Sequence, residues 1–392
     1  YCSTVTDFDR FLVYLLKMKI CFVVSEIGFF LSHRFGMAKE VSVKHKVVLI
    51  TDTSKAKPED FLKLEDVGIE IISVKKRSGS ATLSEYLRYI LELKKKIDLC
   101  SPEYIFFTTV ELSMFGALIH NFIRVKKTFF LITGISEPFF LLNDLKSRLV
   151  RAINKLAYLL LIFNKNYKFI FQNQDDMNIF LNKNISKKSN SLLIKGSGIN
   201  TKEFPFVERN KTKELTFLFA ARLVKSKGFD EFLEAGKIIL EKYPTTKFLA
   251  AGKLDFENSE TVSEKTYQDL QNSGIEFLGE VAYEEMNNLY KKATIFVLPS
   301  YREGLPKAAL EAASTGMPLI LTNVPGCNEC VEDGVNGYLI KEKDLNDLID
   351  KMEKFILNPE IISTMSISSR KIIEKRFSLN LISKEFLKLI ME

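Results

Sequence analysis

Short apolar runs of strand length alternate along the chain with longer stretches of helical periodicity. In the first half, residues 83–96 and 145–163 show the helical pattern, and β-branched and aromatic residues gather in the runs between such stretches. The strand-like runs cover residues 19–25, 46–51, 69–74, 104–108, 128–133 and 169–172. Strands separated by helices are typical of a parallel, doubly wound α/β sheet.

The same alternation restarts after a polar stretch, residues 204–214, that has the composition of a linker. Strand-like runs at 215–220, 246–251, 275–278, 295–298 and 318–322 are interleaved with helical patterns at 229–242, 283–292 and 306–315. The sequence therefore predicts two doubly wound, Rossmann-like domains facing across a cleft. Ligands of such sheets bind beyond the carboxyl ends of the strands.

This pattern divides the chain into four parts. Residues 1–17 are interpreted as an upstream extension without a role in the fold, because Tyr1 is not a natural initiator and Met18 opens directly into a strand-like run. Residues 18–205 form the N-terminal domain, and residues 206–375 form the C-terminal domain. A last helical pattern, 362–391, follows the second sheet, and its final part, 376–392, could pack back on the first domain.

Composition excludes several classes of protein. The 392 residues are 46% hydrophobic and 27% charged, which is ordinary for a globular chain and sufficient for two domains. No period of roughly 20–50 residues repeats, which argues against a solenoid. Five cysteines, an odd number, argue against a disulfide framework and favour a reducing cytoplasm. Cys327 and Cys330 form a C-x-x-C pair, but no second Cys or His pair lies near it to complete a metal site.

The positive charge is concentrated in the first half. Residues 1–205 carry 31 Lys and Arg against 20 Asp and Glu, whereas residues 206–392 carry 25 against 29. A basic half indicates attraction to anionic lipid, phosphate or nucleic acid, although a Lys-rich solvated surface would look the same. No RNA- or DNA-binding motif is present, so we expect no nucleic-acid partner.

One basic segment suggests a membrane surface as a partner. No run reaches the roughly 20 apolar residues that a bilayer-crossing helix needs. The helical pattern at 145–163 instead carries Lys146, Arg148, Arg151 and Lys155 among apolar residues, as a helix lying on an anionic membrane does. The alternative is a core-packed helix with solvated cations. We therefore expect a cytoplasmic protein, peripheral on the inner face of the cell membrane.

Residues 298–311 concentrate candidate chemistry at the end of a strand. A strand-like run ends at Leu298, Pro306 suits the first helical position, and Gly316 suits the helix exit. The start of this helix would point free N–H groups at the space beyond the strand, where its dipole favours a phosphate. Gly304 would let the backbone approach a ligand closely.

Two carboxylates, Glu303 and Glu311, bracket this turn. Their expected role is to accept hydrogen bonds from hydroxyl groups, and a hydrogen bond to a charged group contributes about 1.5–3 kcal/mol. Two such sets could hold a sugar and a ribose. The alternative is a capped surface helix with solvated glutamates, and spacing alone does not decide between the two.

A second strand end carries two cations. The strand-like run ending at Ala220 leads into a loop with Arg222 and Lys227, followed by a helix. Arginine binds phosphate bidentately and lysine acts as a point charge, so the pair could neutralise a diphosphate leaving group without a metal. Each cation alone could be an ordinary loop residue, but both at a strand end of the same sheet favour function.

Four segments together resemble a known family. They read ARLVKSKG, FLGEV, FVLPSYREGLPKAALEAASTGMPLI and VPGCNECVEDGVNGYLI, in this order, from residue 221 to 340. They are similar to the retaining glycosyltransferases of family 4, which have the two-domain GT-B fold, and Glu303 and Glu311 form the E-x7-E pattern of that family. The resemblance spans about residues 18–380. It is greatest to bacterial enzymes that build O-antigen, capsule or lipid-linked glycans.

The resemblance implies a role for each matching residue of the second domain. Arg222 and Lys227 would hold the diphosphate of a nucleotide-sugar donor, which we expect to be a UDP-sugar. Glu303 would contact the donor sugar and Glu311 the ribose.

The resemblance also implies contacts by the neighbouring backbone. The backbone of Gly304 and Leu305 would touch phosphate, and Gly326 and Glu329 match a segment beside the site. Cys327 falls inside that segment, which further weakens a metal interpretation of the C-x-x-C pair.

For the first domain, the resemblance implies an acceptor-side group. Family members carry a Gly-containing loop after the first strand, where Gly28 would approach the sugar diphosphate. His33 and Arg34 would lie near a lipid-linked glycan acceptor or a phosphate, although a lone His is more often structural.

The chain also departs from the family. Many relatives place a His after the fourth strand, where this chain has Thr-Thr-Val-Glu at 108–111, and His120 further on is expected to be structural. A retaining reaction can proceed without a protein base, because the leaving phosphate accepts the acceptor proton. The D-x-D sequence of Asp7 and Asp9 lies in the extension, so we expect no metal cofactor.

Two other classes stay open on the sequence alone. A GT-B fold could serve a nucleotide-sugar epimerase or hydrolase, although such enzymes would be expected to carry more carboxylates or His in the cleft than a chain with three His offers. The chain could also be a non-catalytic, basic membrane-binding module.

Overall fold

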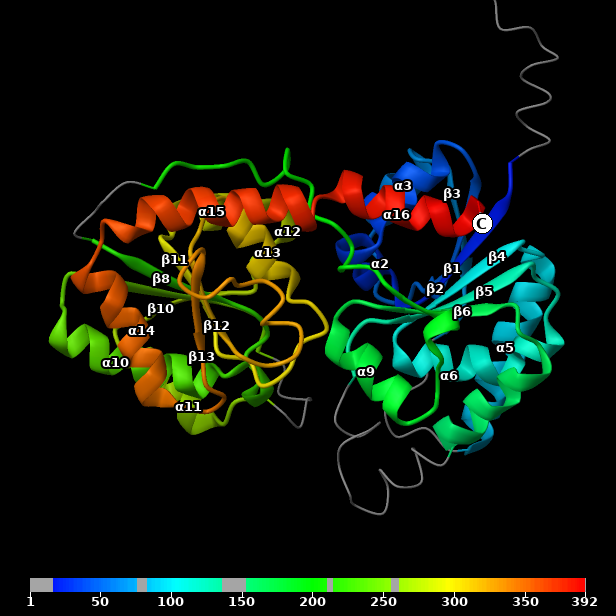
Figure 1. The fold of residues 1–392 in the computed structure, drawn as a ribbon, viewed down its shortest axis with the longest axis horizontal. Coiled ribbons are helices and arrows are strands. Elements are labelled where there is room, and N and C mark those ends of the chain that lie inside the picture. The colour runs from blue at the N-terminus through cyan, green and yellow to red at the C-terminus, as the bar shows by residue number, and fades with distance from the viewer. Residues whose placement is uncertain (1–16, 76–82, 136–152, 210–213, 255–260, 392) are drawn as a thin grey trace, which may run out of the picture. The chain divides into compact units, whose positions relative to one another are not determined.

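The computed structural model describes residues 17–75, 83–135, 153–209, 214–254 and 261–391 and divides the chain into two compact units (Figure 1). Unit 1 comprises residues 1–171, 176–197 and 383–392, and unit 2 comprises residues 172–175 and 198–382. The extension with Asp7 and Asp9, and three of the four basic residues noted at 145–163, lie outside the described residues.

Unit 1 is built on a seven-stranded sheet in the order β3-β2-β1-β4-β5-β6-β7, with every neighbouring pair parallel. The strands are β1 (Lys19–Glu26), β2 (Lys46–Asp52), β3 (Ile69–Ser73), β4 (Tyr104–Thr108), β5 (Lys127–Ile132), β6 (Tyr167–Phe171) and β7 (Ser191–Leu193). The helices are α2 (Ile27–His33), α3 (Phe35–Ser42), α4 (Pro58–Glu65), α5 (Leu83–Cys100), α6 (Val110–Ile119) and α9 (Gln174–Asn182). Residues 153–159 are also helical, and the 3-10 turns are η1 (His120–Phe122), η2 (Leu160–Phe163) and η3 (Lys188–Asn190).

Alternate residues of each strand in unit 1 face two different helical layers. Cys21 and Phe107 pack with residues of α5, α6 and the helix at 153–159 in one buried cluster. Phe22 and Phe106 point to the opposite face, which carries α2 and α3 in Figure 1. This face is completed by α16 (Leu379–Met391), whose Phe386 ring lies 6.0 Å from the Phe22 ring and 4.5 Å from the Phe106 ring.

Unit 2 has a six-stranded parallel sheet in the order β10-β9-β8-β11-β12-β13. The strands are β8 (Thr216–Ala220), β9 (Lys247–Ala251), β10 (Glu276–Gly279), β11 (Ile295–Leu298), β12 (Leu319–Thr322) and β13 (Gly337–Ile340). The helices are α10 (Phe229–Lys242), α11 (Glu264–Gln271), α12 (Tyr283–Lys292), α13 (Lys307–Ser314), α14 (Leu345–Leu357) and α15 (Ile361–Arg376), with the 3-10 turn η4 (Lys225–Lys227). Figure 1 shows α10, α11 and α14 on one side of this sheet and α12, α13 and α15 on the other.

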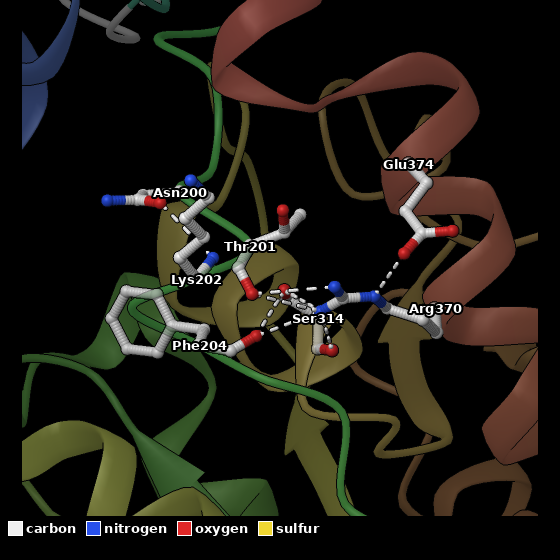
Figure 2. Close-up of polar contacts among 7 residues, drawn as sticks. All are labelled: Asn200, Thr201, Lys202, Phe204, Ser314, Arg370 and Glu374. Atoms are coloured by element: carbon white, nitrogen blue, oxygen red, sulfur yellow. Dashed lines mark hydrogen bonds and ion pairs between the residues drawn. The ribbon is translucent and has the colours of Figure 1, made fainter.

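A partly buried arginine fixes the segment that leads into unit 2. The Arg370 guanidinium of α15 donates to the carbonyl oxygens of Phe204 (3.0 Å) and Ser314 (2.9 Å), and its Nε bonds to Glu374 (2.6 Å), as Figure 2 shows. Ser314 is the last residue of α13, so a cation lies at the carboxyl end of that helix dipole.

Arg209 is a second arginine that binds backbone carbonyl groups at the carboxyl end of α13. Its guanidinium donates to the carbonyl oxygens of Thr315, of Ala293 (3.3 Å) and of Tyr290 (2.8 Å). Burial lowers the pKa of Arg209 to about 10, which leaves it charged at neutral pH. The stretch that the sequence interpreted as a linker is therefore partly core, because Phe204 and Arg209 are both buried. Accordingly, the observed division falls between residues 197 and 198, not at 205.

The last helical pattern is two helices and not one, which corrects the expectation for 362–391. Ile199 donates its N–H to the Phe377 carbonyl (2.8 Å) and accepts the N–H of Leu379 (2.9 Å). Because these backbone groups bond to Ile199, they are not available for a continuous helix, and the chain breaks between α15 and α16. Within the described residues, no helix combines the length and apolar character needed to cross a bilayer.

Candidate active site

Two loops of unit 2 meet at the carboxyl end of its sheet. The loop after β8 contains η4, and the loop after β11 leads to α13; Tyr301 N–H donates to Ser226 O at 2.9 Å between them. Gly228 has a left-handed φ of +70°, and a Cβ there would lie 2.0 Å from the Pro299 carbonyl oxygen. Only glycine allows this close approach, so the two strand ends that the sequence marked are in direct contact.

The contact brings Lys227 and Glu303 together. Lys227 Nζ lies 2.5 Å from Glu303 Oε1, and their side chains are 19% and 12% exposed. Ser300 Oγ lies 3.0 Å from the same carboxylate oxygen and 3.0 Å from Ser226 O, so its hydroxyl can donate to either. A carboxylate and an ammonium held this way are little screened by water, so their charges act strongly on a ligand beside them.

A third loop supports the backbone at Gly304. Gly326 has a φ of +82°, and a Cβ there would lie 2.4 Å from Glu303 O and 2.7 Å from Gly304 O. Glu303 N–H also donates to Pro325 O at 3.1 Å. Leu305, the next residue, is partly buried and packs against the core of unit 2. The three loops therefore fix the path of the backbone just before α13.

Helix α13 begins one residue later than expected. Pro306 is the residue before the helix, with extended backbone (ψ 101°), and Lys307 is the first helical residue. Pro306 lacks an N–H but its carbonyl accepts the N–H of Leu310 at 3.2 Å, so it still starts the helix. As expected, Gly316 takes a left-handed φ of +87° directly after the helix end.

Glu311 lies inside the unit and not on a solvated face. Its side chain is 5% exposed, Lys307 Nζ lies 2.8 Å from its Oε1, and Tyr290 OH donates to its Oε2 at 3.1 Å. Burial raises the pKa of Glu311, and Lys307 opposes that rise. Burial beside Glu311 also raises the pKa of Tyr290 and Tyr283. The sequence did not indicate these tyrosines, because they lie on α12, which shows only an amphipathic pattern.

The remaining residues of this group take different positions. Arg222 follows β8 and is exposed. Glu329 forms an ion pair with Arg376 of α15 at 3.4 Å. Cys327 and Cys330 are buried free thiols, and burial followed by the charge of Glu303 raises the pKa of Cys327.

The three site residues expected in the first domain all belong to unit 1. The sequence predicted a glycine loop after β1, and this was wrong: α2 starts directly at Ile27, and Gly28 is its second residue. A Cβ at Gly28 would meet nothing within 4 Å, so the backbone there is open. His33 ends the helix, its ring stacked on Phe29 at 4.4 Å and its Nδ1 2.7 Å from Ser32 Oγ.

Arg34 is a buried cation at the junction of α2 and α3. It is 3% exposed, and its Nε has no hydrogen-bonding partner among the described residues. Burial lowers its pKa to about 10, so the guanidinium stays charged at neutral pH. A buried charge without a partner is costly, which makes Arg34 the strongest candidate for an anion contact in unit 1.

The loop after β4 differs from a His-bearing loop in structure as well as sequence. Thr109 has φ 92° and ψ 159°, a conformation that a branched residue rarely adopts, and its Oγ1 accepts the N–H of Leu112 at 3.4 Å. His120 is buried, with Nδ1 2.9 Å from Thr128 Oγ1 and Nε2 3.1 Å from Asn164 O. Burial lowers its pKa, and both ring nitrogens are engaged, so His120 has a structural role.

Comparison with known proteins finds glycosyltransferases among the relatives of this chain. The chain is 27% identical over 340 residues to the N,N'-diacetylbacillosaminyl-diphospho-undecaprenol alpha-1,3-N-acetylgalactosaminyltransferase of Campylobacter jejuni, covering 83% of this chain and 87% of that protein. It is 35% identical over 95 residues, 24% of each chain, to the UDP-Gal:alpha-D-GlcNAc-diphosphoundecaprenol alpha-1,3-galactosyltransferase of Escherichia coli.

Solved structures share the fold over nearly the whole chain. Sucrose-phosphate synthase from Thermosynechococcus elongatus superposes with a TM-score of 0.78 at 16% identity, covering 96% of this chain and 98% of that one. Anabaena HepE in complex with UDP and glucose superposes with a TM-score of 0.76 at 16% identity, covering 96% and 100%.

The two doubly wound units have the GT-B fold of these solved structures, and the sequence relatives and a family match identify the chain as a glycosyltransferase. The predicted fold class and enzyme class are confirmed. More narrowly, residues 200–373 match the family of glycosyl transferases group 1, which bears out the resemblance seen in the four segments.

Proposed function

We propose that this glycosyltransferase moves a sugar, with retention of configuration, from a UDP-sugar to a polyprenol-diphosphate-linked glycan of the O-antigen or capsule type. The Lys227–Glu303 pair just before α13 carries the proposal. It places a cation, which can bind phosphate, beside a carboxylate, which can accept hydrogen bonds from sugar hydroxyl groups, at the carboxyl end of one sheet. The names of the Campylobacter and Escherichia relatives specify diphospho-undecaprenol acceptors, and the Anabaena structure holds UDP and glucose.

On the donor side, the diphosphate would compete with Glu303 for Lys227. As Lys227 turns to the phosphate, the Glu303 carboxylate is released to accept hydrogen bonds from sugar hydroxyls. Arg222, which is exposed at the end of β8, would bind the same diphosphate, and the backbone at Gly304 and Leu305 would donate to it.

Glu311 would accept hydrogen bonds from the ribose. Its partners Lys307 and Tyr290 hold the carboxylate in one orientation before the nucleotide arrives. A preorganised acceptor loses less free energy on binding than a mobile one.

The transfer step needs no base from the protein. The bond between the sugar anomeric carbon and the diphosphate oxygen breaks, and the acceptor hydroxyl forms its bond to that carbon on the same face. The acceptor proton passes to the departing diphosphate. Lys227, Arg222 and the start of α13 would stabilise the charge on this leaving group, so we propose that transfer requires no divalent metal.

On the acceptor side, we expect Arg34 to bind an anionic group of the acceptor. A bound acceptor phosphate would supply the partner that its buried Nε lacks, with His33 next to it in sequence and the open backbone at Gly28 in the same helix α2 as His33. A lipid-linked acceptor would place the enzyme on the inner face of the cell membrane as a peripheral protein, with no part for nucleic acid.

A transfer assay with purified protein tests the proposal. A panel of UDP-sugars is offered with a polyprenol-diphosphate glycan and EDTA, and products are identified by mass spectrometry. We expect one donor to be used, and Glu303→Ala to abolish transfer. Glu332→Ala is the matched control, because Glu332 is half exposed and forms its ion pair with Arg376 of α15. Full activity of Glu303→Ala would overturn the site assignment.

A further inference from the structure

The helix at 153–159 and the turn η2 expose apolar side chains on the side that faces away from the core. Asn154, Ala157, Tyr158 and Leu161 face inward and are buried. The outward side carries Ile153, Leu156, Leu159, Ile162 and Phe163, and of these Leu156 is 58% exposed and Phe163 75% exposed. The outward side of a helix in a globular protein is ordinarily polar, but here Lys155 alone is charged.

A neighbouring turn extends this surface. Phe122 in η1 is 67% exposed. The two turns are joined, because Asn121 Nδ2 donates to Leu160 O at 2.8 Å and His120 Nε2 lies 3.1 Å from Asn164 O. We call Phe122, Ile153, Leu156, Leu159, Ile162 and Phe163 the apolar surface. Gathered apolar side chains of this kind mark an interaction site.

The charged residues of the two stretches that contain the apolar surface are of one sign. The sequence has no Asp or Glu in residues 112–136 or 145–174, the two stretches that contain the surface. The same stretches include Arg124, Lys155 and Lys165, which are exposed. A second copy of the chain would bring two such basic stretches against each other, which is unfavourable, whereas an anionic lipid headgroup layer is complementary to them.

We infer that the apolar surface docks the protein on an anionic bilayer, its side chains inserted among the headgroups and its cations against the lipid phosphates. The inference rests on the proposed function, since an enzyme with a lipid-linked acceptor has to work at a membrane. Apolar insertion and electrostatic attraction act together in such interfacial binding. The docking element is the outward face of residues 153–163, joined by η1.

The absence of tryptophan from the chain allows a direct test. Phe163→Trp places a single fluorescent reporter in the apolar surface. Leu62→Trp is the matched control, because Leu62 is 59% exposed in α4, which packs beside α2 on the other face of the same sheet. Vesicles of phosphatidylcholine, with and without phosphatidylglycerol, are added to each full-length variant.

We expect the Phe163→Trp emission to shift to shorter wavelength, and to be quenched by brominated acyl chains, only when phosphatidylglycerol is present. The Leu62→Trp emission should not change. The inference is overturned if the Phe163→Trp emission stays unchanged while the protein sediments with the vesicles, or if no vesicle binds it. A shift that follows protein concentration without vesicles would also overturn it, because it would show self-association.

A second measurement separates docking from chemistry. The double variant Leu156→Ser, Phe163→Ser should bind anionic vesicles roughly tenfold more weakly, while Leu62→Ser binds as the unmodified protein does. Transfer to a short-chain, water-soluble acceptor should be equal in all three. Unchanged vesicle binding by the double variant refutes docking, whatever the activity. If no acceptor is used but vesicle binding still falls, the proposed function fails and docking stands.

Discussion

Replacing Arg370 tests whether the carboxyl end of α13 is held by charge. The Arg370→Met variant keeps the length of the side chain but removes the donors to Phe204 O and Ser314 O. Each hydrogen bond from a charged donor contributes about 1.5–3 kcal/mol, and loss of both would cost about 3–6 kcal/mol. Because the side chain is 18% exposed, water can replace part of this. We expect the free energy of unfolding to fall by about 2–4 kcal/mol.

The loss should appear first as a lower melting temperature. Domains of this size shift by about 2–4 °C per kcal/mol, so circular dichroism should report a fall of about 5–15 °C. The affinity for the nucleotide-sugar donor, measured by calorimetry, should fall as well. The reason is that the loop with Glu303 leads directly into the first turn of α13, so a displaced α13 would also displace Glu303. Arg370→Lys keeps the charge but reaches fewer carbonyls, and should lose about half as much.

Arg376→Met is the control, since it removes an arginine of the same helix that is 28% exposed and that pairs with Glu332, which is half exposed, and with Glu329. Such exposed ion pairs contribute about 1 kcal/mol or less. The claim that Arg370 stabilises the carboxyl end of α13 is refuted if Arg370→Met melts within about 2 °C of the unmodified protein, or at no lower temperature than Arg376→Met.

Three further predictions concern the donor side. Lys227→Met should lower kcat/KM about 10- to 100-fold in the transfer assay through loss of a charged contact, while Lys225→Met, the exposed neighbour, should change it little. Gly228→Ala should destabilise the protein by more than about 2 kcal/mol in thermal unfolding, whereas Gly334→Ala, with a similar φ of +75° and nothing within 4 Å, should cost only about 1 kcal/mol; equal losses would contradict the close approach to Pro299. Burial raises the pKa of Glu311 above its ordinary value of 4.5, so the carboxyl group binds a proton more tightly in the folded protein than in the unfolded chain. At neutral pH the ionised carboxylate therefore lowers the free energy of unfolding, and this loss disappears as the pH falls. The melting temperature of Glu311→Gln relative to the unmodified protein should therefore be highest near neutral pH and fall as pH approaches 4.5, and parallel curves would contradict this.

The sequence predicted most of the strands and several of the longer helices, because the pattern was regular where elements are long, but it did not indicate helices such as α6 and α14. The expected helices at 229–242 and 283–292 match α10 and α12 residue for residue. The strands β7 and β13 were missed, since three or four residues at the end of a sheet are too few to show a period. The break at Phe377 was missed because its cause, pairing with Ile199, is distant in sequence.

The candidate site was predictable only in part, for a similar reason. Parallel strands put their carboxyl ends at one edge, so Lys227 and Glu303 could be expected near each other from topology alone. The residues that hold the carboxyl end of α13 could not be predicted. Arg209 lies in a stretch whose composition is that of a linker, and Arg370 lies on an amphipathic helix, yet both are held by carbonyl groups more than 50 residues away along the chain.

The return of the chain's last helix to unit 1 has a consequence for how the protein is made. Phe22 and Phe106 are translated early, but the ring that stacks on them, Phe386, leaves the ribosome only after the whole of unit 2. During synthesis, domains generally fold in the order in which they emerge, but here the face of unit 1 that holds these two rings stays only partly covered, by α2 and α3, until α16 has been made. We therefore expect unit 1 to complete its core only after the whole of unit 2 has been synthesised.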